Sequence, residues 1–249
     1  MRIAFSGAQG TGKTTLLRDF LTCWPQYKTL NKSYRDIIKE KGLTHSSNTT
    51  EETQRVIRDW MYKEFKNNSK DDKVVYDRCL LDNLVYTLWM YRYIPGSISS
   101  TFVDESIDIM KESMRKLDII FYIPADKCNF ALEDDNFRDT NALYRTQIDQ
   151  IFKGLISEYK ENFDKDVFWP KNDSPGVIDI FGDRQSRLVA IGDYIGTDGD
   201  ILGDEHSIFN EEQLKIAEQM LKEQKDAKEE DNRILKFKEG IEEDLKRHN

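Results

Sequence analysis

The segment Gly7–Thr14 has the residue types and spacing to bind a polyphosphate. It reads Gly-Ala-Gln-Gly-Thr-Gly-Lys-Thr and fits the phosphate-wrapping pattern G-x-x-x-x-G-K-[ST]. The apolar run Ile3–Phe5 before it predicts a buried strand, and apolar residues at helical spacing follow it. Because the glycines let backbone N–H groups turn inward and the helix start adds partial positive charge, this order predicts an anion site.

Individual residues of this segment, the phosphate loop, have expected roles. Lys13 can reach the β- and γ-phosphates of a nucleotide, and the hydroxyl of Thr14 can ligate Mg²⁺. The alternative is a tight glycine turn that contains a lysine, which the flanking strand and helix disfavour. We expect nucleotide contacts from Gly7, Ala8, Gln9, Gly10, Thr11, Gly12, Lys13, Thr14 and Thr15.

Asp77 is the best candidate for the carboxylate that phosphoryl transfer requires. It ends the apolar run Val74–Tyr76 and should therefore lie at the carboxyl edge of a sheet beside Thr14. There it could bind Mg²⁺ or accept the proton of an attacking hydroxyl. The alternative role is to cap the following helix, and the two roles can coexist.

Strands and helices alternate along the chain, which predicts an α/β fold with a parallel sheet covered by helices on both faces. We expect five strands, at Arg2–Ser6, Tyr27–Asn31, Lys73–Asp77, Leu117–Pro124 and Val177–Phe181. We expect helices at Lys13–Cys23, Ser33–Lys41, Glu51–Lys66, Leu81–Tyr93, Phe102–Lys116, Ala142–Tyr159 and Arg184–Ile195. Ligands of such sheets bind beyond the carboxyl ends of the strands.

The composition disfavours several classes of protein. Charged residues make up 33% of the chain, and no apolar stretch is long enough to span a bilayer, so we expect no membrane partner. Because a strand follows Met1 at once and the cysteines are scattered, we expect a cytoplasmic protein with reduced thiols. The net charge of −9 favours a small substrate over nonspecific duplex binding.

The segment Asp77–Asn83 resembles the D-R-x-x-x-D segment of thymidylate kinases and related nucleoside and nucleotide kinases. Three other segments are similar to one branch of that superfamily, which contains the ribosylnicotinamide kinase domain of bacterial NAD regulators and several phage kinases. They are Asp135–Arg138, similar to the D-G-x-R start of a lid, Gly182–Arg187, similar to a G-x-R-x-x-R turn, and Ser33–Arg35, similar to an E-x-x-R segment. The resemblance covers about residues 1–195 and implies the P-loop kinase fold.

The resemblance also implies roles for five arginines. Arg78 would contact the acceptor or the transferring phosphate. Arg138 and Arg145 would belong to a mobile lid over the phosphates, and Arg184 and Arg187 would lie against the adenine. A planar guanidinium suits phosphate oxygens, although each arginine could instead form an ion pair at the surface.

The chain departs from these kinases at two positions. Lys32 stands where relatives carry a glutamate that often takes the proton or grips the substrate. This leaves Asp77 as the best base candidate and Asp36 as the second, and the charge of the lysine could favour an acceptor that already carries a phosphate. Asn136 replaces the lid glycine, and asparagine tolerates left-handed backbone better than most residues.

The residues together predict transfer of the γ-phosphoryl group of ATP·Mg²⁺ to a nucleoside- or nucleotide-type acceptor. The acceptor would be a deoxynucleoside monophosphate or a modified nucleoside. One alternative is a kinase acting on hydroxymethylated bases in phage DNA, which needs a basic groove. Five basic residues could gather on one face for this purpose: Lys66, Lys70, Lys73, Arg115 and Lys116. A second alternative is an ATP-hydrolysing switch or adaptor that signals through its carboxyl-terminal tail.

The expected domain organisation has three parts. Residues 1–195 form the kinase domain with its lid at about 130–146, residues 196–210 form a linker, and residues 211–249 form a charged helical tail. Two narrow apolar stripes in the tail could pack on its own domain or join two copies of the chain.

Overall fold

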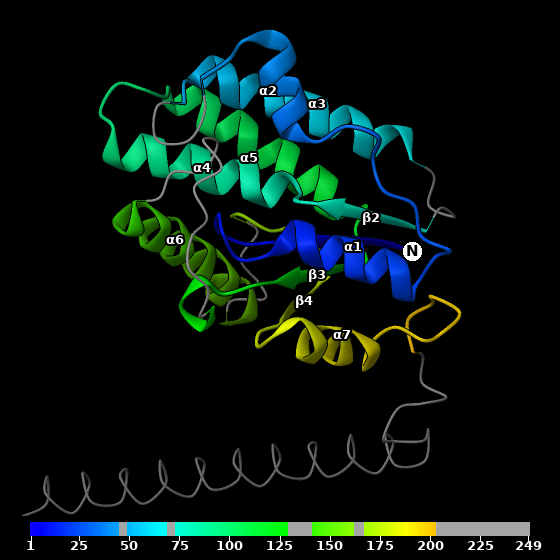
Figure 1. Cartoon of the computed structure of the whole chain (residues 1–249). Helices are drawn as coiled ribbons and strands as arrows, with labels where there is room; N and C mark the ends of the chain where they lie inside the picture. The colour runs from blue at the N-terminus through cyan, green and yellow to red at the C-terminus, as the bar shows by residue number, and fades with distance from the viewer. Residues whose placement is uncertain (45–48, 69–72, 129–140, 162–166, 203–249) are drawn as a thin grey trace, which may run out of the picture. The chain divides into compact units, whose positions relative to one another are not determined.

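The computed structural model describes residues 1–44, 49–68, 73–128, 141–161 and 167–202 (Figure 1). Residues 1–201 belong to one compact unit. The predicted tail, most of the predicted lid, Arg138 and Asn136 lie outside the described residues.

Four parallel strands form the sheet, in the order β2-β1-β3-β4. Their bounds are Arg2–Ser6 for β1, Val74–Asp77 for β2, Ile119–Tyr122 for β3 and Gly176–Asp179 for β4. Phe5 near the end of β1 pairs with Asp77 at the end of β2. The phosphate loop, which follows β1, therefore leaves the sheet next to Asp77.

The fifth expected strand, at Tyr27–Asn31, is wrong. Only Lys28 bridges to β2, through hydrogen bonds of 2.9 Å from its N–H to the carbonyl of Lys73 and from the N–H of Val75 to its own carbonyl. The residues near Lys28 make contacts with other parts of the structure. The hydroxyl of Tyr27 donates to the carbonyl of Gly199 at 2.7 Å, and Leu30 packs against the core instead of continuing along the edge of the sheet.

Seven α-helices and a short 3-10 helix accompany the sheet in the part of the chain that the structure describes. They are α1 (Lys13–Cys23), α2 (Tyr34–Lys41), α3 (Glu51–Asn67), α4 (Leu80–Tyr93), α5 (Ser100–Met114), α6 (Ala142–Glu161) and α7 (Arg184–Gly192), with η2 at Ala125–Lys127. Helices α2 to α6 pack on one face of the sheet, and α1 and α7 pack on the other (Figure 1). Helices on both faces were expected, and each helix falls within a few residues of its predicted bounds.

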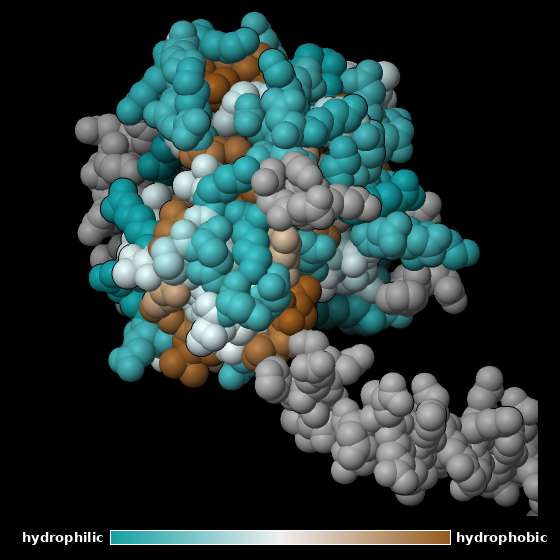
Figure 2. Space-filling model, turned by 90° about the vertical axis from the view of Figure 1, so that its right-hand side faces the viewer, coloured by the Kyte–Doolittle hydropathy of each residue, from teal (hydrophilic) through white to brown (hydrophobic). Residues whose placement is uncertain are grey.

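Alternation along the strands explains the two layers. Ile3 and Phe5 of β1 belong to the core cluster with α1 and α7, and Ala4 between them belongs to the other cluster. The face of the molecule in Figure 2 is mostly hydrophilic, with apolar residues in separate patches. No helix among the described residues is long and apolar enough to cross a membrane.

Candidate active site

Glycines shape the phosphate loop at three positions. Gly7, Gly10 and Gly12 have φ angles of 143°, 70° and 83°, a range that other residues rarely adopt. A Cβ atom added to Gly7 would lie 2.6 Å from the carbonyl oxygen of Ile123, just after β3. The close approach of these two backbones fixes the loop against the end of the sheet.

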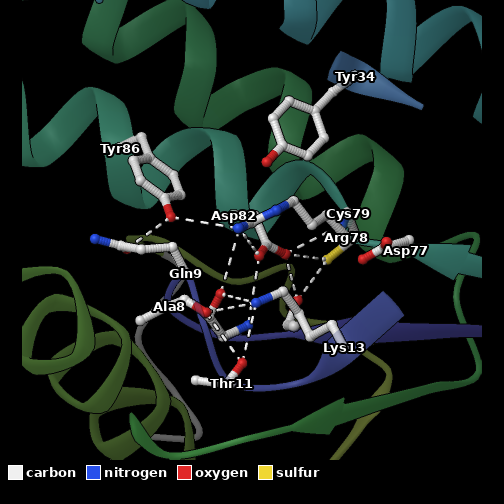
Figure 3. Close-up of polar contacts among 12 residues, drawn as sticks. Ala8, Gln9, Thr11, Lys13, Tyr34, Asp77, Arg78, Cys79, Asp82 and Tyr86 are labelled. Carbon is white, nitrogen blue, oxygen red and sulfur yellow. Dashed lines mark hydrogen bonds and ion pairs between the residues drawn. The ribbon is translucent and has the colours of Figure 1, made fainter. Parts of the chain in front are cut away.

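Lys13 begins α1 and folds back beneath the loop (Figure 3). Its Nζ atom donates hydrogen bonds to the carbonyl of Gly7 at 2.8 Å, the carbonyl of Ala8 at 2.5 Å and the hydroxyl of Thr11 at 3.1 Å. Burial, followed by repulsion from Arg78, holds the pKa of the Lys13 ammonium well below its ordinary value. A polyphosphate beside Nζ would stabilise its charged form.

Thr14 and Asp77 come together as their positions in the sequence predict. The hydroxyl of Thr14 donates a 2.7 Å hydrogen bond to Oδ2 of Asp77, across the gap between α1 and the end of β2. Asp77 does not cap the following helix, because Cys79 occupies that position. The carboxylate of Asp77 is half-buried and borders the cavity at the phosphate loop.

Asp82 lies in the first turn of α4 and holds the surrounding residues in place, a role that its sequence position did not reveal (Figure 3). Its carboxylate is 1% exposed and accepts hydrogen bonds from the hydroxyl of Ser6 at 2.5 Å, the N–H of Cys79 at 3.1 Å and Nη1 of Arg78 at 2.8 Å. The N–H of Gly7 lies 3.4 Å from it. Asp82 therefore ties β1, the phosphate loop and α4 together.

Arg78 sits between the end of β2 and the start of α4 in a left-handed conformation, with φ of 80°. Its guanidinium lies between two aromatic rings, 5.2 Å from the ring centroid of Tyr34 and 5.3 Å from that of Tyr86. Tyr86 also donates a 3.2 Å hydrogen bond to Oε1 of Gln9 in the phosphate loop. Tyr34 was not among the predicted site residues; it lies between Ser33 and Arg35, in the segment similar to the E-x-x-R motif.

A cavity of about 190 Å³ is lined by most of the phosphate loop, by the start of α2 and by Asp77 and Arg78. The phosphate loop forms one wall, and the start of α2 faces it with Ser33, Tyr34 and Arg35. Asp77, at the end of β2, and Arg78 line it as well. The cavity thus combines backbone amides, cations, a carboxylate and an aromatic ring.

A second cavity of about 180 Å³ lies on the other side of α1, where the adenine contacts were expected. Arg184 and Arg187 both line it, with Thr15 and Asp19 of α1. Arg184 pairs with Asp19 through two contacts of 2.9 and 2.5 Å, and this hydrogen-bonded pair lowers the pKa of the Asp19 carboxyl. Arg187 instead reaches the phosphate loop.

The remaining predicted residues are less closely grouped. Arg145 in α6 reaches the loop, with Nη2 at 3.4 Å from the carbonyl of Gly10. Lys32 does not line the first cavity, because it is exposed and pairs with Glu40 at 2.7 Å. Asp36 is exposed and caps α2 together with Ser33.

The family follows from comparison with known proteins. Residues 2–164 match the family model described as AAA domain. The chain belongs to the AAA domain family. No curated protein sequence matches this AAA domain chain.

Solved structures show the fold. Thymidylate kinase from Candida albicans is 12% identical, with a TM-score of 0.55 over 82% of this chain and 95% of that one. Deoxyadenosine kinase from M. mycoides is 14% identical, with a TM-score of 0.51 over 77% of this chain and 96% of that one. NadR in complex with NR is 16% identical, with a TM-score of 0.54 over 81% of this chain and 53% of that one. The AAA domain chain has the P-loop kinase fold, as its resemblance in sequence implied.

Proposed function

We propose that this protein transfers the γ-phosphoryl group of ATP to a nucleoside- or nucleotide-type acceptor. The observation that carries the proposal is the 2.7 Å hydrogen bond between Thr14 and Asp77, beside a phosphate loop that holds Lys13. A hydroxyl and a carboxylate in contact at this position are the groups that phosphoryl transfer needs to place a metal ion.

Each residue has a chemical role in this proposal. The amides of the loop and Lys13 hold the β- and γ-phosphates, and Arg78 and Arg145 balance negative charge during transfer. Asp77 accepts the proton of the attacking hydroxyl. Arg138, which lies outside the described residues, would act with Arg145 in the lid.

The donor set fits Mg²⁺. Magnesium prefers oxygen ligands, is commonly held by one or two protein groups and takes its other ligands from phosphates and water. Thr14 and Asp77 supply two such oxygens, and no cluster of three or more metal-binding side chains occurs among the described residues. When bound, Mg²⁺ would neutralise charge on the β- and γ-phosphates.

The wall opposite the phosphate loop has the chemistry of an acceptor site. Arg35 and Arg78 offer cations, and Tyr34, the first residue of α2, offers an aromatic ring that lines the cavity. Such a combination suits a nucleoside or nucleotide, which carries an aromatic base and, in a nucleotide, a phosphate. Thymidylate kinase and deoxyadenosine kinase share the fold, and their names specify acceptors of this class.

The basic residues proposed for a DNA groove lend little support to that alternative. Lys66 lies 3.8 Å from Glu112, and Lys73 lies 3.0 Å from Asp200, so each has an acidic partner. Lys70 lies outside the described residues. A small-molecule acceptor is therefore the favoured form of the proposal.

Phosphoryl transfer from labelled ATP tests the proposal directly. Nucleosides, deoxynucleoside monophosphates, nicotinamide riboside and hydroxymethyluracil-containing DNA would be offered in parallel. We expect Lys13→Ala and Asp77→Asn each to lower turnover by at least about a hundredfold while the protein stays folded. Asp104→Asn, a change at an exposed position on α5, is the matched control and should leave turnover unchanged. Turnover near the wild-type value in either Lys13→Ala or Asp77→Asn would contradict the proposal.

A further inference from the structure

Two arginines from separate helices grip consecutive carbonyls of the phosphate loop. Nη1 of Arg187, in α7, donates a 2.7 Å hydrogen bond to the carbonyl of Thr11. Nη2 of Arg145, in α6, lies 3.4 Å from the carbonyl of Gly10. The contact of Arg187 is the shorter one, and that side chain is the more deeply buried, with 3% of the residue exposed.

The preceding part of the loop is held in the same way. The carbonyls of Gly7 and Ala8 accept hydrogen bonds from Nζ of Lys13. Nη1 of Arg78 lies 3.3 Å from the carbonyl oxygen of Gly7. Cationic side chains from four parts of the fold thus contact the carbonyl side of the loop.

Peptide geometry converts these contacts into an orientation of the N–H groups. All described peptide bonds are trans, and in a trans peptide the C=O and the following N–H point in opposite directions. When Arg187 holds the carbonyl of Thr11, the N–H of Gly12 is turned away from Arg187. By the same geometry, Arg145 on Gly10 turns the N–H of Thr11 away from α6. Thr11 and Gly12 both line the cavity in which the phosphates are proposed to bind.

Arg187 is fixed firmly enough to perform this role. Its Nε donates to the carbonyl of Gly182 at 3.0 Å, and its Nη2 lies 3.3 Å from Sγ of Cys128. All three guanidinium nitrogens therefore have partners within the protein. A planar fork with three fixed contacts holds a carbonyl more rigidly than a flexible lysine would.

We infer that Arg187 is a positioning residue for the phosphates of the nucleotide, acting through the carbonyl of Thr11, and not a contact to the adenine as its place in the sequence suggests. The inference rests on the proposed function, because it assumes that the loop binds a triphosphate. Arg184, three residues earlier, lines the same second cavity but has a side chain that is 73% exposed and pairs with Asp19. The two arginines should therefore affect different parts of the nucleotide.

Binding of Mg²⁺·tripolyphosphate, which has no adenine, separates the two roles. Its affinity would be measured by calorimetry beside that of Mg²⁺·ATP. We expect Arg187→Gln to lower the affinity for both ligands by a similar factor, about tenfold, because a hydrogen bond from a charged group is lost. The matched control Arg184→Gln should leave the affinity for tripolyphosphate unchanged.

Three results would overturn the inference. In the first, Arg187→Gln lowers the affinity for ATP but not for tripolyphosphate, which would indicate an adenine contact. In the second, Arg187→Gln lowers the unfolding temperature but alters neither affinity, which would indicate a structural role alone. If Arg187→Gln does not fold, Arg187→Lys is compared in the same way. In the third, the wild-type chain binds neither ligand, which would show that the loop is not a phosphate site. A wild-type chain that binds both ligands but transfers no phosphoryl group would overturn only the proposed function.

Discussion

The buried pair of Asp82 and Arg78 gives the sharpest test of how the site is held together. The change is Asp82→Asn, which keeps the shape of the side chain and removes its charge. Asp82 is 1% exposed and Arg78 is 7% exposed, so the guanidinium would remain buried beside a neutral amide. One donor nitrogen of the new amide would also face donors that now contact a carboxylate oxygen.

The structure sets the expected magnitude. Removing one partner of a buried ion pair costs about 3–5 kcal/mol, and the lower end applies here because the asparagine retains one acceptor oxygen. A loss of about 3 kcal/mol corresponds to a fall of roughly 6–12 °C in the unfolding temperature of a domain of this size. Activity should fall as well, because Arg78 loses the contact that fixes its guanidinium.

Urea unfolding of a double-mutant cycle measures the coupling. The cycle contains Asp82→Asn, Arg78→Met and the double variant, and we expect the double variant to lose about 1–3 kcal/mol less than the sum of the single losses. The pair of Asp19 and Arg184, which is open to solvent on the arginine side, is the matched control, with side chains that are 13% and 73% exposed. Asp19→Asn should cost less than about 1 kcal/mol, because solvent screens such a pair.

Additive single losses would refute the reasoning. So would a cost for Asp82→Asn no larger than that for Asp19→Asn. Either result would mean that the contacts of Asp82 do not form one cooperative network, and that the phosphate loop and α4 are held independently.

Two further predictions concern the phosphate loop. Gly7→Ala should abolish nucleotide binding and lower the free energy of unfolding by at least about 2 kcal/mol, because Gly7 combines a φ of 143° with a backbone atom 2.6 Å from an added Cβ. The control Gly42→Ala, with φ of 62° and open space around the added Cβ, should cost about 1 kcal/mol and leave binding intact. Urea unfolding and ATP titration of both variants test this, and equal costs would contradict it. Nucleotide affinity should fall as the pH rises toward the ordinary pKa range of lysine. Burial lowers the pKa of Lys13 in the free protein and bound phosphates raise it, so binding takes up a proton. Calorimetry in buffers of different ionisation enthalpy measures this uptake, and proton release in that pH range would contradict the account.

The sequence was most informative where chemistry and local structure coincide. The pattern Gly7–Thr14 can only work between a strand and a helix, so it predicted β1 and α1 to the residue. Asp77 could be placed beside Thr14 because Asp77 ends β2 and the loop that leads to Thr14 leaves β1 at the same edge of a parallel sheet. These contacts depend on topology, which the alternation of strands and helices reveals.

Contacts that depend on tertiary packing could not be predicted in this way. The segment at residue 27 has the composition of a strand, but Tyr27 and Leu30 are drawn into other contacts and only Lys28 pairs. Lys32 has the position expected of an acceptor contact, yet Glu40, two turns along the same segment, pairs with it. In both cases the deciding partner is a side chain or carbonyl that the local pattern does not contain.

The carboxylates at 77 and 82 show the same limit. Both belong to one short motif, and the strand end placed Asp77 beside the phosphate loop, but nothing in the spacing reveals that Asp82 is enclosed. Burial separates them, because Asp82 is enclosed by donors of Ser6, Gly7, Arg78 and Cys79 while Asp77 is left half-buried beside Thr14. The enclosed carboxylate supports the loop, and the other is available to a metal ion or a substrate hydroxyl.

The left-handed backbone at Arg78 has a consequence for how this position can vary. With φ of 80°, any side chain there carries about 1–2 kcal/mol of conformational strain, which only glycine escapes. Glycine, however, has no guanidinium to place between the two tyrosine rings. The backbone conformation thus favours glycine, and the charge of the site favours arginine. The native arginine lowers the stability of the fold and places a positive charge at the cavity.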